Sequence, residues 1–301
     1  MKFNLLNVYA LFSLSLMVGS HAVTPEVYWK SVLPNSPMPK AIKDLLYTAE
    51  EKNTNAGVGK RYVGVTHKTV ILIYSVPMDE LKVDPNEASF FLENDLHEGT
   101  EMKLHFVKDE QKSAFLPRHV ADSIPFSSNK LPQIYDKFSI KSNSVEAKSM
   151  KQTLSVCESK GIEGEEKYCA TSLESMVDFS TNKLGKKVKA MSTEVNAEGS
   201  TPLQKYTIEG SMKLASDKAV VCHKQNYMYA VFYCHKTVSV KAYAVSLVGV
   251  DGTKVKGVAV CHTDTAKWNP KHLAFQVLKV KPGSVPVCHF LPEDNVVWVP
   301  Y

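Results

Sequence analysis

The chain has 301 residues, of which 44% are hydrophobic and 22% are charged. This composition excludes a disordered tail, a collagen-like repeat and a polytopic membrane protein, because the apolar content is that of a globular chain and glycine and proline are at ordinary levels. With 36 Lys and Arg against 31 Asp and Glu, the formal net charge of +5 is too small for this length to indicate a nucleic-acid-binding protein.

The first 22 residues have the pattern of a secretory signal peptide. Lys2 supplies the positive charge, residues 5–18 form an apolar stretch, and Ser20-His21-Ala22 is a small-residue cleavage site. The apolar stretch is shorter than the ~20 residues needed to cross a bilayer, and no later segment is free of charges for long enough. We therefore expect an exported chain without a transmembrane segment, in which the six cysteines tend to pair.

Residues 23–88 are predicted to be a variable, loosely ordered segment, because they are rich in Pro, Lys, Asn and Gly. One β-prone apolar run, at residues 70–74, interrupts this segment. Its simplest interpretation is a short edge strand or a patch docked on the main domain. The alternative is a peptide that resembles an enzyme substrate.

A compact domain is predicted for residues 89–301. The apolar and polar residues at 102–107 alternate, which is typical of a half-buried strand. Two helices are expected next, the first with an apolar face over residues 147–157. The second is expected to start at the capping box 171–174 and to end at Gly185.

Cys157 lies in the first of these helices and Cys169 just before the second. A disulfide between them would close a charged loop and contribute about 3 kcal/mol by the loop-entropy model. The alternative is a pair of free buried thiols.

The chain becomes β-rich after residue 206. The predicted strands are residues 219–222, 227–234, 238–250, 255–261, 275–280 and 285–290. Asp251-Gly252 predicts a hairpin turn, and a helix is expected with Asn269 as N-cap and Pro270 at its first position. The predicted fold class is α+β: a mostly antiparallel, disulfide-braced β-rich domain with two or three helices, preceded by a loosely ordered N-terminal segment.

Four of the six cysteines are each followed directly by a histidine. The pairs are Cys222-His223, Cys234-His235, Cys261-His262 and Cys288-His289, separated by 10, 25 and 25 residues. Structural zinc sites use close Cys-x2–4-Cys or His-x3–5-His pairs, whereas neighbours on a strand point to opposite faces. The cysteines and the histidines are therefore expected to take different roles.

In an exported protein the simplest division is two disulfides among the four cysteines, with four imidazoles free to converge on a metal. Four cysteines allow three connectivities, and the sequence leaves all three open. Ligation by imidazoles alone favours copper, with zinc and nickel as alternatives. The competing interpretation is that the histidines only form hydrogen bonds with loops near the disulfides.

This spacing of Cys-His pairs resembles that of the plant BURP domain. The resemblance covers residues 89–301 and includes Phe90-Phe91-Leu92-Glu93 near its start and Val297-Trp298-Val299-Pro300 at its end. Residues 115–118, 121–126 and 224–227 are similar to the dehydration-responsive branch of that family.

The resemblance implies a secreted protein of the cell wall, apoplast or vacuole that is associated with dehydration and other abiotic stress. Its implied partners are a cell-wall protein or a separate precursor peptide, with no nucleic acid. Some members of the family are copper-dependent peptide cyclases that crosslink a Tyr or Trp side chain in a core peptide, and one branch is a non-catalytic subunit of a cell-wall enzyme. Whether this chain is an enzyme is left open, and no catalytic residue is assigned.

Two sets of residues follow from the resemblance. The histidines implicated in copper binding correspond to His223, His235, His262 and His289. The candidate core peptide within the chain itself is Ile71, Leu72, Ile73 and Tyr74, with Val27-Tyr28-Trp29-Lys30 as the alternative. The other histidines, among them His97 and His272, are expected to be surface or packed residues.

Overall fold

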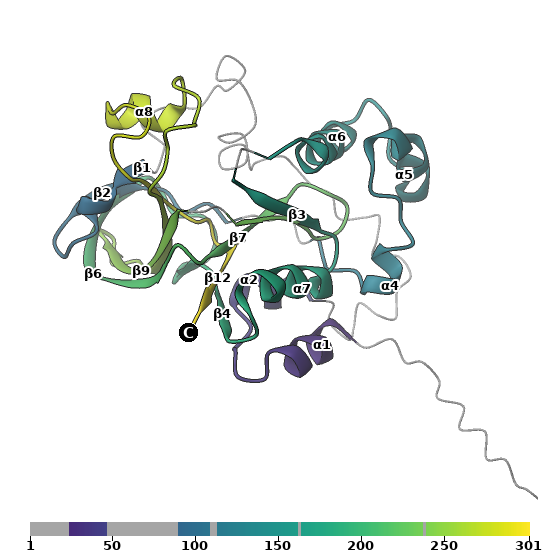
Figure 1. The fold of residues 1–301 in the computed structure, drawn as a ribbon, viewed down its shortest axis with the longest axis horizontal. Helices are drawn as coiled ribbons and strands as arrows, with labels where there is room; N and C mark the ends of the chain where they lie inside the picture. Colours follow the sequence, from purple (N-terminus) through teal and green to yellow (C-terminus); the bar gives the residue numbers. More distant parts are fainter. Residues whose placement is uncertain (1–23, 47–89, 109–112, 162–163, 237–238) are drawn as a thin grey trace, which may run out of the picture.

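The computed structural model describes residues 24–46, 90–108, 113–161, 164–236 and 239–301. Two antiparallel sheets form its centre (Figure 1). The predicted signal peptide and the candidate core peptide at residues 71–74 lie outside the described residues.

The first sheet curls until its two edge strands, β1 and β2, lie near each other in Figure 1. Its strands, in spatial order, are β1 (Phe90–Leu92), β11 (Val287–Phe290), β10 (Lys254–His262), β9 (Val240–Gly249), β6 (Gln204–Ser216) and β2 (Glu101–Leu104), with β5 (Glu194–Val195) paired to β10. The inside of the curl is filled by apolar side chains, including Phe91, Tyr206 and Phe290. These side chains stabilise the sheet by removing large apolar surfaces from water.

The second sheet has five strands. In spatial order they are β3 (Glu166–Ala170), β8 (Val231–Lys236), β7 (Val220–Gln225), β12 (Val296–Pro300) and β4 (Val188–Met191). An apolar cluster that includes Val221 and Val297 from this sheet and Val260 from the first joins the two sheets. Every described strand pair is antiparallel, which confirms the predicted fold class.

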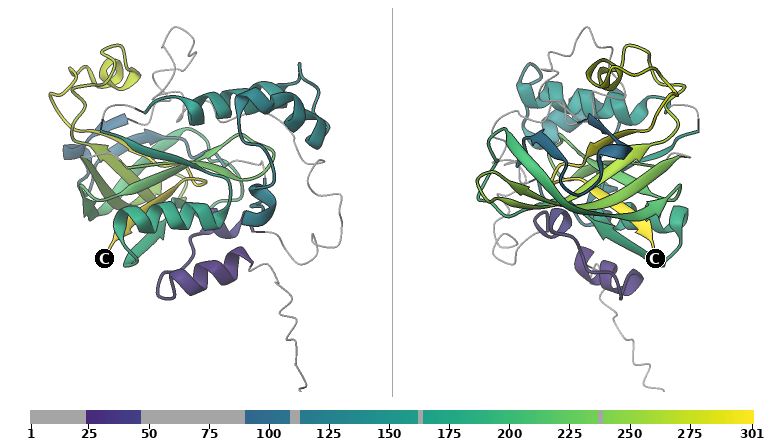
Figure 2. Two further views of the ribbon diagram at one scale, coloured as in Figure 1. Left: turned by 45° about the vertical axis from the view of Figure 1, so that its right-hand side comes forward. Right: turned by 90° about the vertical axis from the view of Figure 1, so that its left-hand side faces the viewer.

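Helices cover both sides of the second sheet (Figure 2). They are α1 (Pro25–Val32), α2 (Lys40–Lys43), α4 (Arg118–Ala121), α5 (Leu131–Phe138), α6 (Val145–Glu158) and α7 (Leu173–Leu184), with the 3-10 turn η5 (Ser128–Lys130) just before α5. A second 3-10 turn, η4 (Glu93–Asp95), follows β1 in the first sheet. Helices α7 and α1 lie on one side of the strands, and α6 lies on the other (Figure 2). A further helix, α8 (Leu273–Leu278), lies at the end of the curled sheet (Figure 1).

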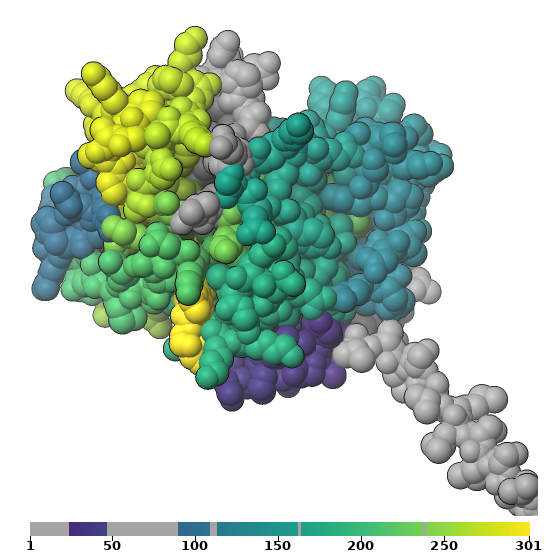
Figure 3. All heavy atoms as spheres, viewed as in Figure 1, coloured from purple at the N-terminus to yellow at the C-terminus, as the bar shows by residue number. Residues whose placement is uncertain are grey.

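Within the predicted loosely ordered segment, the described residues 24–46 contain the helices α1 and α2 and pack on the domain. Trp29 and Ile42 are buried in the same apolar cluster as α7 and the outer face of the second sheet. The backbone N–H of Phe115 donates to the carbonyl oxygen of Leu45 at 2.8 Å, and the hydroxyl of Tyr28 donates to Asp178 on α7. Figure 3 shows residues 24–46 as a purple patch against α7.

Two predicted helix starts differ from the structure by a few residues. The N-cap of α7 is Ser172 and not Thr171, and Ser172 and Ser175 cap each other. Glu174, the expected capping partner, is buried and accepts a hydrogen bond from the backbone N–H of Arg118 instead.

The start of α8 is also later than predicted. Asn269 accepts a hydrogen bond from the backbone N–H of Lys271 and so forms a turn, while His272 is the N-cap. The strand predicted for residues 275–280 is wrong, because most of these residues belong to α8. A short apolar run does not distinguish a strand from a buried helix, and here Phe275 packs against Trp268 as part of a helical face.

Candidate metal centre

The four Cys-His pairs lie on four strands, β7, β8, β10 and β11, in register. Cys222 lies directly opposite Cys234, and Cys261 directly opposite Cys288. Each opposed pair forms a disulfide, which decides among the three connectivities that the sequence left open. The predicted Cys157–Cys169 disulfide is also formed and joins α6 to β3, so all six cysteines are paired.

The alternation of side chains along a strand separates the sulfur atoms from the imidazoles. Cys222 and Cys234 are buried in the cluster beneath α7, and Cys261 and Cys288 in the interior of the curled sheet. The histidine after each cysteine therefore points to the opposite face, where the two sheets pack together. The disulfides crosslink the strands on the faces turned away from this interface, whereas the histidines lie within it.

His223 and His235, which come from the neighbouring strands β7 and β8, are in direct contact. Their Nε2 atoms are 3.2 Å apart. The rings of His262 and His289, from β10 and β11, stack with centroids 5.7 Å apart and an interplanar angle of 13°. All four residues are only 4–6% exposed.

Burial favours the neutral form of three of these imidazoles. Burial, together with the charges of neighbouring imidazoles, lowers the pKa of His223 and that of His262 well below 6.5. Burial also lowers the pKa of His289 to about 4, although the carbonyl of Phe290 acts in the opposite direction. Because each of these pKa values is lowered partly by an imidazole of the other pair, the two pairs share one electrostatic environment.

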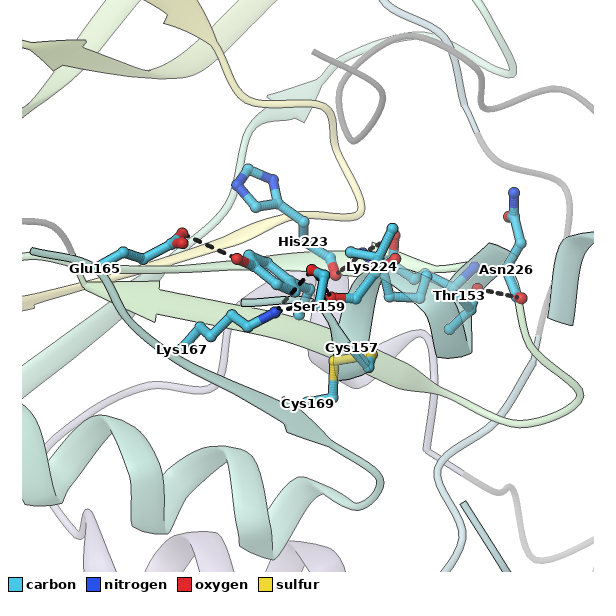
Figure 4. The surroundings of a disulfide bond; sticks show 12 residues. Thr153, Cys157, Ser159, Glu165, Lys167, Cys169, His223, Lys224 and Asn226 are labelled. Atoms are coloured by element: carbon cyan, nitrogen blue, oxygen red, sulfur yellow. Dashed lines mark hydrogen bonds between the residues drawn. A yellow bond between two sulfur atoms is a disulfide. The ribbon is translucent and has the colours of Figure 1, made fainter. Parts of the chain in front are cut away.

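Polar side chains surround the first histidine pair. Oε1 of Glu165 lies 2.9 Å from Nδ1 of His235 and accepts a hydrogen bond from the hydroxyl of Tyr233. Nδ2 of Asn295 lies 3.0 Å from Nδ1 of His223. Figure 4 shows Glu165 just before β3, with its carboxylate pointing along the sheet, and His223 above the strands.

The second pair has a more aromatic surrounding. Nδ1 of His289 lies 3.2 Å from the carbonyl oxygen of Phe290. Because a carbonyl oxygen can only accept a hydrogen bond, Nδ1 carries the ring proton and the lone pair of this imidazole is on Nε2. The ring of Trp268 packs against His262 with centroids 5.0 Å apart and against His272 at 4.6 Å.

His272 is the one histidine of the neighbourhood that the Cys-His pattern did not indicate. It is buried, and it is close enough to His262 to lower the pKa of that imidazole. The only signal in the sequence is its place before the apolar run of α8, where its Nδ1 accepts the N–H of Ala274. His97, by contrast, is exposed and contacts its local neighbours Glu98 and Thr100.

The structure brings the four predicted ligands together as two pairs. Among the described residues, no three His, Cys, Asp or Glu side chains lie close enough together to hold one ion as they stand. Within the first pair, however, the 3.2 Å separation of the Nε2 atoms suits two neighbouring ligands of one ion. Metal–nitrogen bonds of about 2.0–2.1 Å at an angle of about 100° span that distance.

Comparison with known proteins places this fold in a family. Residues 89–300 match the model of the BURP domain. BURP domain protein RD22 of Arabidopsis thaliana is 42% identical over an alignment that covers 93% of this chain and 94% of the relative. In Oryza sativa subsp. japonica, BURP domain-containing protein 5 is 48% identical over 93% of this chain and 88% of its own length, and BURP domain-containing protein 3 is 56% identical over 75% and 53%.

The chain therefore belongs to the plant BURP-domain family, in the branch of RD22. The family predicted from the Cys-His spacing is confirmed, and so is the branch predicted from residues 115–118, 121–126 and 224–227. No helix in the described part of the chain is both long and apolar enough to cross a membrane.

Proposed function

We propose that this chain is an exported, stress-associated BURP-domain protein that binds copper through His223, His235, His262 and His289. The observation that carries the metal-binding part is the contact between the Nε2 atoms of His223 and His235 inside a buried cluster of four imidazoles. Residues that only filled a core would not need four imidazoles from four strands at one interface.

The donor set supports copper over the other first-row metals. All four predicted ligands are imidazoles, and the sulfur atoms that would favour zinc are consumed in disulfides on the other faces of the sheets. The lowered pKa values of three of the histidines keep nitrogen lone pairs available at neutral pH. Zinc and nickel are the alternatives that a competition experiment distinguishes.

The protein itself positions the four imidazoles and keeps water away from them. The two disulfides fix the register of the strands that carry the histidines, and the apolar seam between the sheets excludes water from the rings. When bound, copper would supply one-electron chemistry that no side chain offers.

Export is supported by the pairing of all six cysteines, since disulfides persist in oxidising compartments. Stress association is supported only by the resemblance to the dehydration-responsive branch. Recovery of the tagged full chain from apoplastic fluid or vacuoles tests export, and retention in the cytosol would contradict it.

A second candidate is a copper-dependent peptide cyclase. The observation that favours it over simple metal storage is the shielding of the imidazoles from water, at 4–6% exposure, which suits oxidative chemistry. The reaction would remove two hydrogen atoms from a peptide containing Tyr or Trp and pass them to molecular oxygen. The test is incubation of the copper-loaded protein with a peptide of residues 71–74 under oxygen, followed by mass spectrometry; an unchanged mass would contradict cyclisation of this peptide.

Metal analysis tests the proposed site itself. The purified mature protein, loaded with copper and then desalted, is expected to retain the metal, and His235→Ala to lose it. His97→Ala is the matched control, because it removes an exposed imidazole outside the cluster.

A further inference from the structure

A chain of polar contacts runs through the first histidine pair and ends on Asn295 at one side and on Glu165 at the other. The contacts are Asn295 to His223 at 3.0 Å, His223 to His235 at 3.2 Å, and His235 to Glu165 at 2.9 Å. Each of these side chains has a fixed number of protons to donate. This number determines which atom donates and which accepts in each of the three contacts.

The Asn295 end fixes the first step. The backbone N–H of Lys224 donates to Oδ1 of Asn295 at 3.1 Å, so the amide nitrogen Nδ2 is the atom that faces His223. Nδ2 can only donate, and Nδ1 of His223 must therefore be an acceptor. A ring whose Nδ1 accepts a hydrogen bond carries no proton there, so the proton of His223 is on Nε2.

The second step follows from the first. The proton on Nε2 of His223 points at Nε2 of His235, which must accept it and cannot itself carry a proton. The proton of His235 is then on Nδ1. The Glu165 end agrees, because its carboxylate oxygen lies within ion-pair distance of Nδ1, at 2.9 Å, where a nitrogen lone pair would be repelled and an N–H is favoured.

We propose that Glu165 is the positioning residue of this cluster, holding His235 in the Nδ1–H tautomer, and that Asn295 holds His223 in the opposite, Nε2–H tautomer. The side chain of Glu165 is 7% exposed, and its Oε1 also accepts from Tyr233, so its orientation is fixed from a second direction. The metal part of this inference rests on the proposed copper site; the tautomers do not.

The two histidines are then unequal as ligands. His235 presents a lone pair on Nε2 backed by a carboxylate, the arrangement that orients metal-bound imidazoles in general. His223 carries a proton on the atom that would bind the ion. To become a ligand it must move that proton to Nδ1, and the amide of Asn295 must turn over to accept it, which gives up the bond from Lys224.

A carboxylate at position 295 would remove this conflict. Its two oxygens can accept both the N–H of Lys224 and a proton on Nδ1 of His223. Asn295→Asp is therefore expected to strengthen copper binding about tenfold, whereas loss of Glu165 is expected to weaken it by about 10- to 100-fold. The opposite signs separate this account from a general loss of stability, which would weaken binding in both variants.

The first experiment uses the metal-free full-length mature protein and histidine-selective 15N NMR. His235 is expected as the Nδ1–H tautomer and His223 as the Nε2–H tautomer, and Glu165→Ala is expected to shift the Nδ1 resonance of His235, which loses its carboxylate partner, while His223 stays Nε2–H. A parent protein with His235 as Nε2–H, or an unchanged spectrum in Glu165→Ala, would overturn the proposal whether or not copper binds.

The second experiment measures copper affinity by competition with a chelator. The expected order is parent, then Glu165→Gln, then Glu165→Ala, because Gln keeps an acceptor but loses the charge. Glu166→Gln and Glu166→Ala are the matched controls, since Glu166 is the next residue, exposed, and paired with Lys183. Equal affinities for the variants at 165 and 166 would overturn the metal part, and a parent that binds no copper would instead overturn the proposed function.

Discussion

The indole of Trp29 packs on the indole of Trp298, with ring centroids 5.3 Å apart. Trp29 lies on α1, 60 residues before the segment that matches the family, whereas Trp298 lies on β12, the final strand. Both are buried, and Nε1 of Trp29 donates to the carbonyl of Ser36 at 2.9 Å. The folded unit therefore includes residues 24–46 as well as the BURP domain.

Trp29→Ala is expected to lower the free energy of unfolding by about 3–5 kcal/mol, as for other buried aromatic side chains that leave a cavity. Val27, on the same helix but 55% exposed, gives the control: Val27→Ala is expected to change stability by less than about 0.5 kcal/mol. Denaturant unfolding of the two variants measures the difference. Equal stabilities would mean that α1 contributes little to the fold.

Removing the Cys157–Cys169 disulfide is expected to cost about 3 kcal/mol, because it closes a loop with a sequence separation of 12. The double variant Cys157→Ala, Cys169→Ala tests this while leaving the two bridges beside the histidines intact. A midpoint of urea unfolding unchanged from the parent would contradict the estimate.

Reduction of all three disulfides is expected to unfold the domain far more readily than removal of metal by a chelator. The bridges join strands and a helix across the fold, whereas the histidines occupy one buried interface. Circular dichroism during titration with a thiol or with a chelator compares the two treatments. The reverse ranking would show that metal and not the disulfides holds the fold.

The stability of the metal-free protein is expected to fall as the pH decreases below about 6.5. The pKa of His289 is about 4 in the folded state, so between these two values the unfolded chain takes up a proton at this position and the folded chain does not. His289 alone would lower the free energy of unfolding by about 2 kcal/mol between pH 7 and pH 5. The buried His223 and His262, whose pKa values are also lowered, act in the same direction.

The measurement is the difference in unfolding free energy between these two pH values. His289→Gln is expected to reduce this difference by about the same 2 kcal/mol. His97→Gln, at an exposed position, serves as the comparison. A pH dependence in His289→Gln as steep as that of the parent would show that this imidazole is not held neutral by the fold.

The separation of cysteines from histidines was predictable because strand alternation depends only on neighbouring residues. The pairing of Cys222 with Cys234 and of Cys261 with Cys288 was not, since it depends on the register of strands that tertiary packing selects. The hairpin turn at Asp251-Gly252 was a local signal, and the structure confirms it with a positive φ of 86° at Gly252 between β9 and β10.

The parts that sequence reasoning missed depend on long-range contacts. Helix α1 has local signals, with Pro25 at its start and Glu26 in its first turn, but it is only eight residues long and is held by burial of Trp29 against the domain. Glu165 lies in a charged loop of the sequence, and only the pairing of β3 with β8 brings it to His235.

The most direct test of the central claim is the copper affinity of the purified mature protein compared with that of His235→Ala. Loss of a ligand is expected to weaken binding by more than about 100-fold, which exceeds the effect typical of an outer partner. His97→Ala, measured in parallel, is expected to bind as the parent does. A parent that retains no copper, or His235→Ala binding as tightly as His97→Ala, would contradict the claim that the histidines gathered between the two sheets form a copper site.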